Sequence, residues 1–316
     1  MNLTALAEVL RNYYTEAIPV YRVAVPVLMA LCLIGIMANG FLLHTATKIL
    51  DLHPTLLFTY SLAASDLWSL LIILLGLLVN SYLPFVARIP KLLHQDCYMH
   101  ALEAVRLGAL LTSVLHLLVL AMCHYVVTTH PLTHRLRLVP WVKPALIFLW
   151  FIPALCFLTI FFIYYKQTFG HPSCTVTLSH SDELRVGLFL IVSAALLTTV
   201  LIYVRMILKL NEMQEQMLTG RRASIIRRRT RMLLTAILII GTFLLGWLPG
   251  VLWFMITCNS CPLPLADLYE HAPTVVYVFG ITVNALIIFK AVLNPIIYAV
   301  RLPEIQKVAR VGQTAD

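Results

Sequence analysis

The chain has 316 residues, of which 60% are hydrophobic and only 12% are charged, and its formal net charge is +9. A soluble domain carries about twice this fraction of charged residues, so lipid must be the solvent for much of the chain. These numbers exclude an ordinary soluble enzyme or binding domain, and they predict an all-α membrane protein. No repeat, linker or low-complexity tract divides the chain, so we expect one domain.

Seven apolar stretches follow one another along the chain, and each is long enough for a membrane-spanning helix of about 20 residues. They cover residues 20–49, 55–83, 98–128, 140–165, 184–208, 232–257 and 271–300. We therefore expect a seven-transmembrane helix bundle over residues 20–300, after an extracellular N-terminus at 1–19. The tail at 301–316 is predicted to be cytoplasmic and to hold a short amphipathic helix. The polar segment from Lys209 to Arg231 is predicted to continue the two helices beside it into the cytosol.

The basic residues indicate the orientation of the bundle. With the N-terminus outside, 15 of the 23 lysines and arginines fall on the inner side and six on the outer side. This asymmetry follows the positive-inside rule and predicts a multi-pass plasma-membrane protein with an extracellular N-terminus. It also explains the net charge by contact with anionic membrane lipids, so no nucleic-acid partner is expected.

Two features of the outer segments suit this orientation. Asn2 begins an Asn-Leu-Thr pattern for N-glycosylation, and Cys258 and Cys261 lie close together in an outer loop. The oxidising side of the membrane favours a small loop disulfide between these cysteines. A zinc half-site is the alternative, but no second cysteine pair lies near. No metal site or cofactor is expected, and the scattered histidines and carboxylates carry no enzyme signature.

Polar residues and prolines inside the apolar stretches are the informative positions, because polar groups in a membrane are costly and usually face the bundle interior. In chain order these positions are Asn39, Asp66, Ser113, Cys123-His124-Tyr125, Tyr203, Phe243, Trp247-Leu248-Pro249 and Asn294-Pro295-Ile296-Ile297-Tyr298. This set, in this order, resembles the rhodopsin-like (class A) G-protein-coupled receptors over nearly the whole chain.

The resemblance implies a receptor that passes the signal of an extracellular ligand to a heterotrimeric G protein. It also implies a ligand pocket in the outer half and a mobile sixth helix. Pro249 removes a backbone hydrogen bond and is expected to kink that helix, with Trp247 at the pocket floor and Phe243 one turn below. Pro295 is expected to act in the same way on the seventh helix.

The cytosolic end departs from the family pattern. His124, which precedes Tyr125, replaces the arginine of the family's Asp/Glu-Arg-Tyr, and Arg229 replaces the acid that usually pairs with that arginine. Tyr203 and Tyr298 look like the pair that meets near the cytosolic opening in the active state. In the family, the arginine and the acid form an ion pair that holds the resting state. Because both residues are replaced here, a non-signalling decoy or partner receptor is the alternative function. A membrane transporter is a third candidate, but the lack of inverted repeats argues against it.

A lysine inside the seventh stretch is the second departure. By family position, Lys290 lines the interior beside Asn39, Asp66, Ser113 and Asn294, where relatives commonly hold a sodium ion. A lone buried lysine is strongly penalised, whereas a pair with Asp66 resolves both charges. We therefore expect an internal salt bridge in place of sodium.

The third stretch carries two charges in its outer half. Glu103 and Arg106 lie one helical turn apart. Arg106 matches the position where amine receptors carry an aspartate, so it favours a ligand with an anionic group, including lipid-like or peptide-like ligands. An internal Glu103–Arg106 pair is the alternative. The other residues expected around the pocket are Tyr98, Trp247, Trp253, Phe254, Tyr277 and Asn284.

The sequence also predicts a disulfide, a phosphorylation site and a likeness to particular receptors. The family resemblance implies a disulfide between Cys97 and Cys174 that ties the third helix to the second outer loop. Ser224 follows Arg221-Arg222-Ala223 and fits a basic-directed kinase site. The fifth stretch has no proline, and this feature, with the two cysteines of the last outer loop, indicates a weaker likeness to melanocortin, adenosine and lysophospholipid receptors.

Overall fold

The computed structural model describes residues 3–48, 54–89, 96–130, 139–160, 182–215, 221–257, 261, 263–301 and 305–306. Within these ranges the chain forms helices. In chain order they are α1 (Leu3–Ala46), α2 (Pro54–Leu77), the π-helix η1 (Leu78–Val86), α3 (Asp96–Thr129), the 3-10 helix η3 (Val139–Trp141), α5 (Val142–Thr159), α6 (Asp182–Glu215), α7 (Arg221–Ile256), α8 (Leu265–His271) and α9 (Pro273–Arg301). Seven helical stretches of the described chain are long and apolar enough to cross a membrane, which confirms the predicted bundle. Helices suit such stretches because a bilayer offers the backbone no water, so each N–H and C=O needs a partner within the segment.

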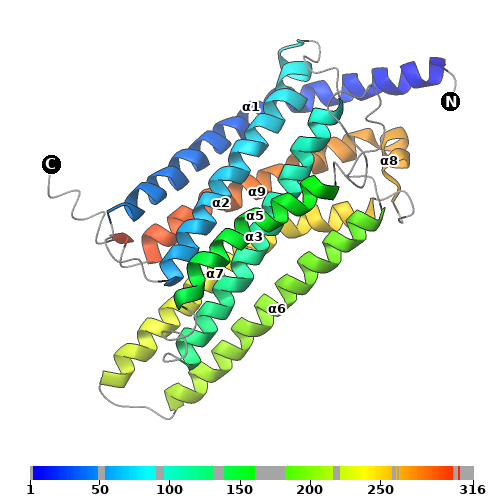
Figure 1. Ribbon diagram of the computed structural model, residues 1–316. Helices are drawn as coiled ribbons and strands as arrows, with labels where there is room; N and C mark the ends of the chain where they lie inside the picture. Colours follow the sequence, from blue (N-terminus) through cyan, green and yellow to red (C-terminus); the bar gives the residue numbers. More distant parts are fainter. Residues whose placement is uncertain are drawn as a thin grey trace, which may run out of the picture.

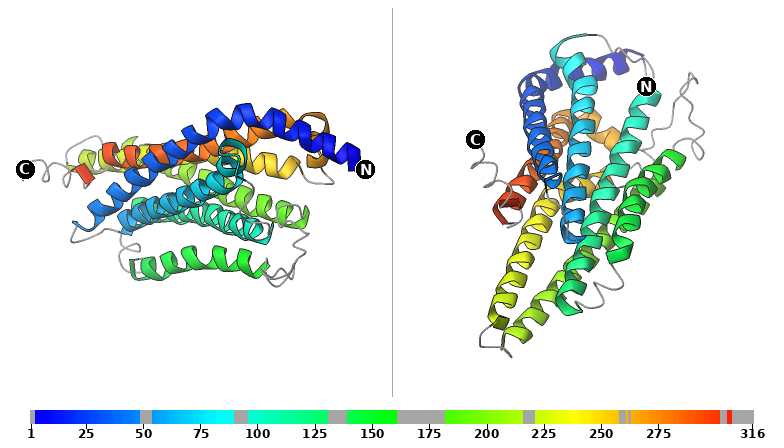
Figure 2. Two further views of the ribbon diagram at one scale, coloured as in Figure 1. Left: turned by 90° about the horizontal axis from the view of Figure 1, so that it is seen from above. Right: turned by 60° about the vertical axis from the view of Figure 1, so that its left-hand side comes forward.

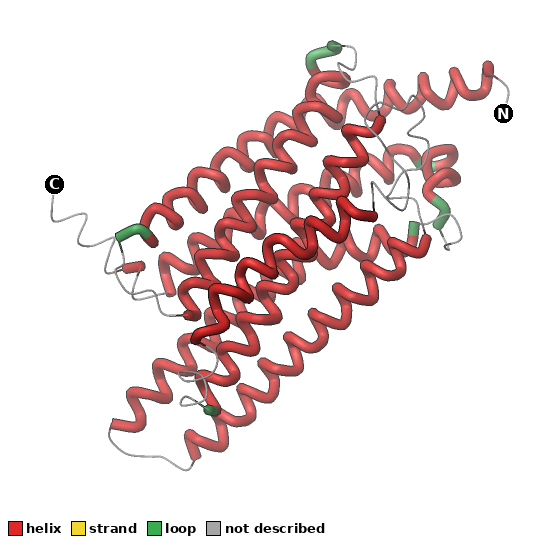
Figure 3. The backbone as a smooth tube through the Cα atoms, viewed as in Figure 1, coloured by secondary structure: helices red, strands yellow, loops and turns green. Residues whose placement is uncertain are grey.

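The long helices lie side by side in one elongated bundle with the two termini at opposite ends (Figure 1). α3 packs against α2, α5, α6 and α7, whereas α1 packs against α2 and α9, and α9 packs against α7. α5 lies at the margin of the bundle, as the view from above shows (Figure 2). Helices dominate the whole length of the described chain (Figure 3). We call the end where α1 begins the N-terminal end and the end where α9 finishes the C-terminal end.

Unlike a soluble protein, the bundle has an apolar outer surface around a core that is mainly apolar and also holds charged groups. Large apolar residues face outward, as Phe41 at 68% exposure and Leu245 at 70% exposure illustrate. Charged residues such as Asp66 and Lys290 lie inside at 2% exposure each. This sorting fits a bundle whose outer surface is solvated by hydrocarbon, where an internal polar group must find its partners on neighbouring helices.

Helix boundaries follow the prediction in some places and extend it in others. α6 continues to Glu215 and α7 begins at Arg221, so the polar segment does prolong the two helices beside it. α1 begins at Leu3, and hydropathy alone does not reveal this extension because residues 3–19 are too polar to be part of an apolar stretch. Their alanine, leucine and glutamate residues favour helix nonetheless. The predicted amphipathic helix of the tail lies largely outside the described residues.

Close contact between α7 and α9 depends on a glycine. A Cβ atom built on Gly246 would lie 2.8 Å from Cβ of Lys290 and 3.2 Å from the carbonyl oxygen of Leu286. Neither atom belongs to a flexible end of a side chain, so the two helices would have to move apart. On the same helix, a Cβ atom on Gly241 would meet nothing within 4 Å.

These two glycines form a matched pair for mutagenesis. We expect Gly246→Ala to lower the free energy of unfolding by about 1–3 kcal/mol through overpacking. Gly241→Ala is expected to raise it by up to about 1 kcal/mol because alanine has the higher helix propensity. Thermal unfolding of the purified protein in detergent measures both. A Gly246→Ala variant at least as stable as Gly241→Ala would contradict the packing described.

Candidate functional site

A cavity of about 320 Å³ opens inside the bundle towards its N-terminal end. Its wall is built from α1, α3, α6, α7 and α9 and is mainly aliphatic and aromatic. Among the described residues that line it, Arg106 is the only charged one, and Asn284 supplies an amide. Its volume falls near the lower limit of small-molecule pockets, and an apolar wall with a few polar groups is their usual composition. The cavity is therefore a candidate binding site for a small ligand.

Six of the eight residues predicted around the pocket line this one cavity. They are Arg106, Trp247, Trp253, Phe254, Tyr277 and Asn284. The side chains of Glu103 and Tyr98 fall outside the described part of the structure. Tyr21 of α1, which the sequence did not predict as a pocket residue, also lines the cavity, and its ring lies 5.8 Å from that of Tyr277 and 4.9 Å from that of Phe85. Nothing in the local sequence of Tyr21 signals this contact, which depends on how α1 packs against η1 and α9.

Trp247 has an unusual place in the cavity wall. Its side chain is 6% exposed, and its indole N–H has no hydrogen-bond acceptor among the residues that the structure describes. A buried donor without a partner costs about 1–3 kcal/mol. A ligand that brings an acceptor to this nitrogen would remove that cost.

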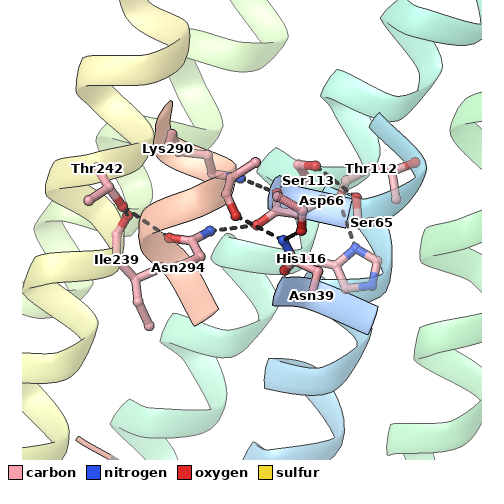
Figure 4. A network of polar contacts seen from close by, with 12 residues as sticks. Asn39, Ser65, Asp66, Thr112, Ser113, His116, Ile239, Thr242, Lys290 and Asn294 are labelled. Atoms are coloured by element: carbon pink, nitrogen blue, oxygen red, sulfur yellow. Dashed lines mark hydrogen bonds and ion pairs between the residues drawn. The ribbon is translucent and has the colours of Figure 1, made fainter. Parts of the chain in front are cut away.

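Below the cavity, an ion pair joins α9 to α2 (Figure 4). The ammonium group of Lys290 donates a hydrogen bond to Oδ1 of Asp66. The side-chain amide of Asn294 donates to Oδ2 of Asp66 at 2.6 Å. Both carboxylate oxygens are therefore satisfied, which is what a charge this deep in a low-dielectric interior requires. The structure thus contains the Lys290–Asp66 pair that the sequence predicts.

The same pair touches α7, the sixth membrane-spanning helix. Lys290 Nζ lies 5.2 Å from the ring centroid of Phe243, within the range of a cation–π contact. The Phe243 ring lies 6.4 Å from that of Trp247. A second link runs through Thr242, whose hydroxyl lies 3.2 Å from Oδ1 of Asn294. The cavity floor and the ion pair are thus joined by successive contacts.

The other two members of the predicted polar network have different partners. Asn39 donates from Nδ2 to the backbone carbonyls of Gly35 and Ala291, at 2.9 Å each. Ser113 is hydrogen-bonded to Ser65 at 2.8 Å. Both side chains are fully buried near Asp66 (Figure 4), and they hold α1 to α9 and α2 to α3.

A buried histidine that was not predicted from the sequence, His116, joins α2, α3 and α5. Nδ1 of His116 lies 2.8 Å from the carbonyl oxygen of Thr112, and Nε2 lies 2.8 Å from the Ser61 hydroxyl. Trp150 donates from its indole nitrogen to the same hydroxyl at 2.9 Å. A neutral imidazole protonated at Nδ1 satisfies all three contacts. The cluster is complete within itself, so we assign it a structural role.

Arg185 lies near the start of α6, where an arginine is expected to be exposed, yet its side chain is only 3% exposed. It lies in the first turns of α6 and reaches the last turn of α7. There it donates to the carbonyl oxygen of Phe254 at 2.9 Å and to the Thr257 hydroxyl at 3.2 Å. Its guanidinium carbon lies 4.4 Å from the Phe254 ring centroid. A cation at the carbonyl end of a helix is favourable, and here it also fixes a residue of the cavity wall.

At the C-terminal end, the predicted switch residues meet only in part. Nδ1 of His124 is hydrogen-bonded to the Tyr203 hydroxyl at 3.1 Å. Tyr298 is completely buried, and its hydroxyl has no hydrogen-bond partner in the described part of the chain. Tyr203 is therefore paired with His124 here and not with Tyr298. Tyr125 packs beside this cluster.

Several predicted residues fall outside what the structure describes. The side chains of Cys97, Arg229 and Ser224 belong to this group, and so do Cys174, Cys258 and Asn2 as a whole. Cys261 is disulfide-bonded, but its predicted partner is not among the described residues. Glycosylation, phosphorylation and both disulfide pairings therefore stay predictions.

Comparison with known proteins gives one positive result. No curated protein matches the chain, and the weaker likeness to melanocortin, adenosine and lysophospholipid receptors stays a prediction. The family model described as "7 transmembrane receptor (rhodopsin family)" matches residues 39–298. That segment runs from Asn39 of α1 to Tyr298 of α9, so it takes in the polar network and the described residues that line the cavity, apart from Tyr21. The chain therefore belongs to the rhodopsin family of seven-transmembrane receptors.

Proposed function

We propose that this receptor binds an extracellular ligand in the cavity and passes the signal to a heterotrimeric G protein by movement of α7. Membership of the rhodopsin family supports a signalling receptor that is a multi-pass membrane protein and not an enzyme. In this proposal the N-terminal end of the bundle faces outward at the plasma membrane. The C-terminal end, with the basic residues around the α6–α7 connection, faces the cytosol.

The observation that carries the proposal is the line of contacts along α7. Trp247 lines the cavity, the ring of Phe243 is its neighbour one turn away, and Phe243 contacts Lys290 of the internal ion pair. Pro249 lies inside the same helix and removes one of its backbone hydrogen bonds, which lowers the cost of bending. A ligand that displaces Trp247 would therefore bend α7 at a place where it lacks a backbone hydrogen bond. The movement would also change the contact between Phe243 and the buried charge of Lys290.

The cavity also favours a class of ligand. Arg106 places a positive charge in an otherwise uncharged described wall, and guanidinium groups bind carboxylates and phosphates well. The Trp247 indole N–H adds a second donor. We propose a small, largely apolar ligand with an anionic group at Arg106 and an acceptor near Trp247.

A cell assay tests this function. The receptor is expressed with a promiscuous G protein and screened against small organic acids. We expect an active acid to lose about 100-fold in potency on Arg106→Gln, because truncating one partner of a buried charge pair costs 2–5 kcal/mol. Arg205→Gln, an exposed arginine of α6, serves as the control. An active ligand that is equally potent on the Arg106→Gln variant would contradict the anionic class.

Glu103→Gln separates the two readings of Arg106. If Glu103 neutralises Arg106 as an internal pair, its removal should raise the potency of an acidic ligand. If Arg106 serves the ligand alone, the potency should stay the same. Either result is compared with the Arg106→Gln variant in the same assay.

A non-signalling receptor is the second candidate, and a specific contact favours it. His124 stands where the family carries an arginine, and its ring is held by Tyr203. If the receptor does not signal, the wild-type protein gives neither basal nor ligand-driven G-protein activation, and the His124→Arg variant gains G-protein activation. His130→Arg, an exposed histidine of the same region, controls for an added charge. Activation by the wild-type protein would exclude this candidate.

A further inference from the structure

A second hollow lies on the outer surface of the bundle between α7 and α9. This groove has a volume of about 500 Å³ and is lined by Leu244, Leu245, Leu248, Pro249, Leu252, Trp253, Ile256 and Phe279. Every one of these residues is apolar, and all lie within the two membrane-spanning stretches Leu233–Ile256 and Pro273–Arg301. The groove therefore faces hydrocarbon, and its occupant must come from the bilayer.

Among the described residues, Trp253 lines both the groove and the cavity. Its ring stacks on Phe279 with 4.2 Å between centroids and 22° between planes. Phe279 lines the groove but not the cavity, so the stacked pair forms the partition between the two hollows. On the cavity side, the next residue is Gly280, where a Cβ atom would meet nothing within 4 Å. Open space therefore lies directly beside the partition.

The wall at the N-terminal end of the cavity is different. Tyr21, Phe85 and Tyr277 come from α1, η1 and α9 and form one aromatic cluster. Two of these rings line the cavity. On the α7–α9 side, among the described residues, one stacked pair of rings separates the cavity from the groove, and open space lies beside it at Gly280, so fewer rings have to part there.

We infer that the Trp253–Phe279 stack is a lateral gate, through which an amphiphilic acid dissolved in the bilayer enters the cavity. This inference rests on the proposed function, because it needs an anionic ligand at Arg106. The hydrocarbon chain lies first in the groove, and the rings then part. The acid group moves inward to Arg106, where it exchanges the membrane interface for a guanidinium partner. The ligand class becomes an alkanoate-like amphiphile.

The test measures entry rates with a defined probe. Purified receptor in lipid nanodiscs is mixed with 12-bromododecanoate, whose bromine quenches tryptophan fluorescence on contact, and the quenching is followed by stopped flow. Wild-type protein should show saturable quenching that is lost in Arg106→Gln. An aromatic stack stabilises a closed gate by an amount that converts to about five-fold in rate. Phe279→Ala should therefore raise the association and dissociation rates by about five-fold each, with little change in the dissociation constant.

The matched control is Phe289→Ala. Phe289 is a phenylalanine of the same helix that is 58% exposed on the outer surface and lines neither hollow, so its variant should bind at the wild-type rates. Unchanged rates in Phe279→Ala, together with loss of binding in Arg106→Gln, would overturn the gate and leave the proposed function standing. Saturable quenching that is absent in wild type, or undiminished in Arg106→Gln, would overturn the anionic ligand class and the gate with it.

Discussion

Lys290→Met is expected to lower the free energy of unfolding by about 3–5 kcal/mol, because it leaves a buried carboxylate without its cation. Asp66 is 2% exposed and, among the described residues, would keep the amide of Asn294 as its hydrogen-bond partner. Methionine has a length similar to that of lysine, so the loss reflects charge more than volume. Thermal unfolding of the purified receptor in nanodiscs measures the change.

The double variant Lys290→Met with Asp66→Asn tests whether the unpaired charge causes the loss of stability. It removes both charges at once, and we expect it to recover most of the stability that the single variant loses, because replacing a whole buried pair is often neutral. Lys209→Met breaks an exposed pair with Glu212 on α6, and it should leave the unfolding midpoint in place. A double variant as unstable as Lys290→Met would contradict the pair as the source of the effect. Sodium-dependent stability of the wild-type receptor would show that the ammonium group does not take the place of the ion.

Arg185→Met is expected to lower the free energy of unfolding by about 3 kcal/mol, because two hydrogen bonds that the guanidinium group donates and one cation–π contact are lost. The variant should also weaken ligand binding. Arg185 holds the backbone and ring of Phe254, and Phe254 lines the cavity. The unfolding midpoint and the potency of an active ligand are measured on the same preparation.

Arg205→Met provides the comparison for this second variant. Arg205 lies on the same helix but is exposed, so its loss should alter neither property by much. A stable Arg185→Met variant with unchanged ligand potency would mean that the link between α6 and α7 contributes little. A variant that is less stable but keeps full potency would mean that Arg185 stabilises the contact between α6 and α7 without affecting ligand binding.

The sequence predicts well the features that follow from the apolar environment of the bilayer. An apolar stretch must be a helix in a bilayer, so the spans follow from hydropathy. The Lys290–Asp66 pair could also be predicted, because neither charge is tolerable alone in the interior and each is the natural partner of the other.

The features that were missed depend on how helices meet. Arg185 lies near a helix start, where an exposed charge is the ordinary expectation, and only the packing of α6 against α7 reveals its burial. The contacts of His116 come from Ser61 and Trp150 on two other helices. The groove requires the relative placement of α7 and α9. No local pattern encodes these arrangements.

The pairing of Asp66 with Lys290 also bears on how the receptor is made. The two partners are 224 positions apart in the chain, and Asp66 belongs to the second span whereas Lys290 belongs to the last. Chains are synthesised from the N-terminus, so the helix with Asp66 reaches the membrane long before its cation exists. An unpaired aspartate at the centre of a membrane helix costs about 2.5–3.5 kcal/mol on insertion scales. We therefore expect the contacts of the second span to reach their full stability only after α9 has entered the membrane and supplied the cation.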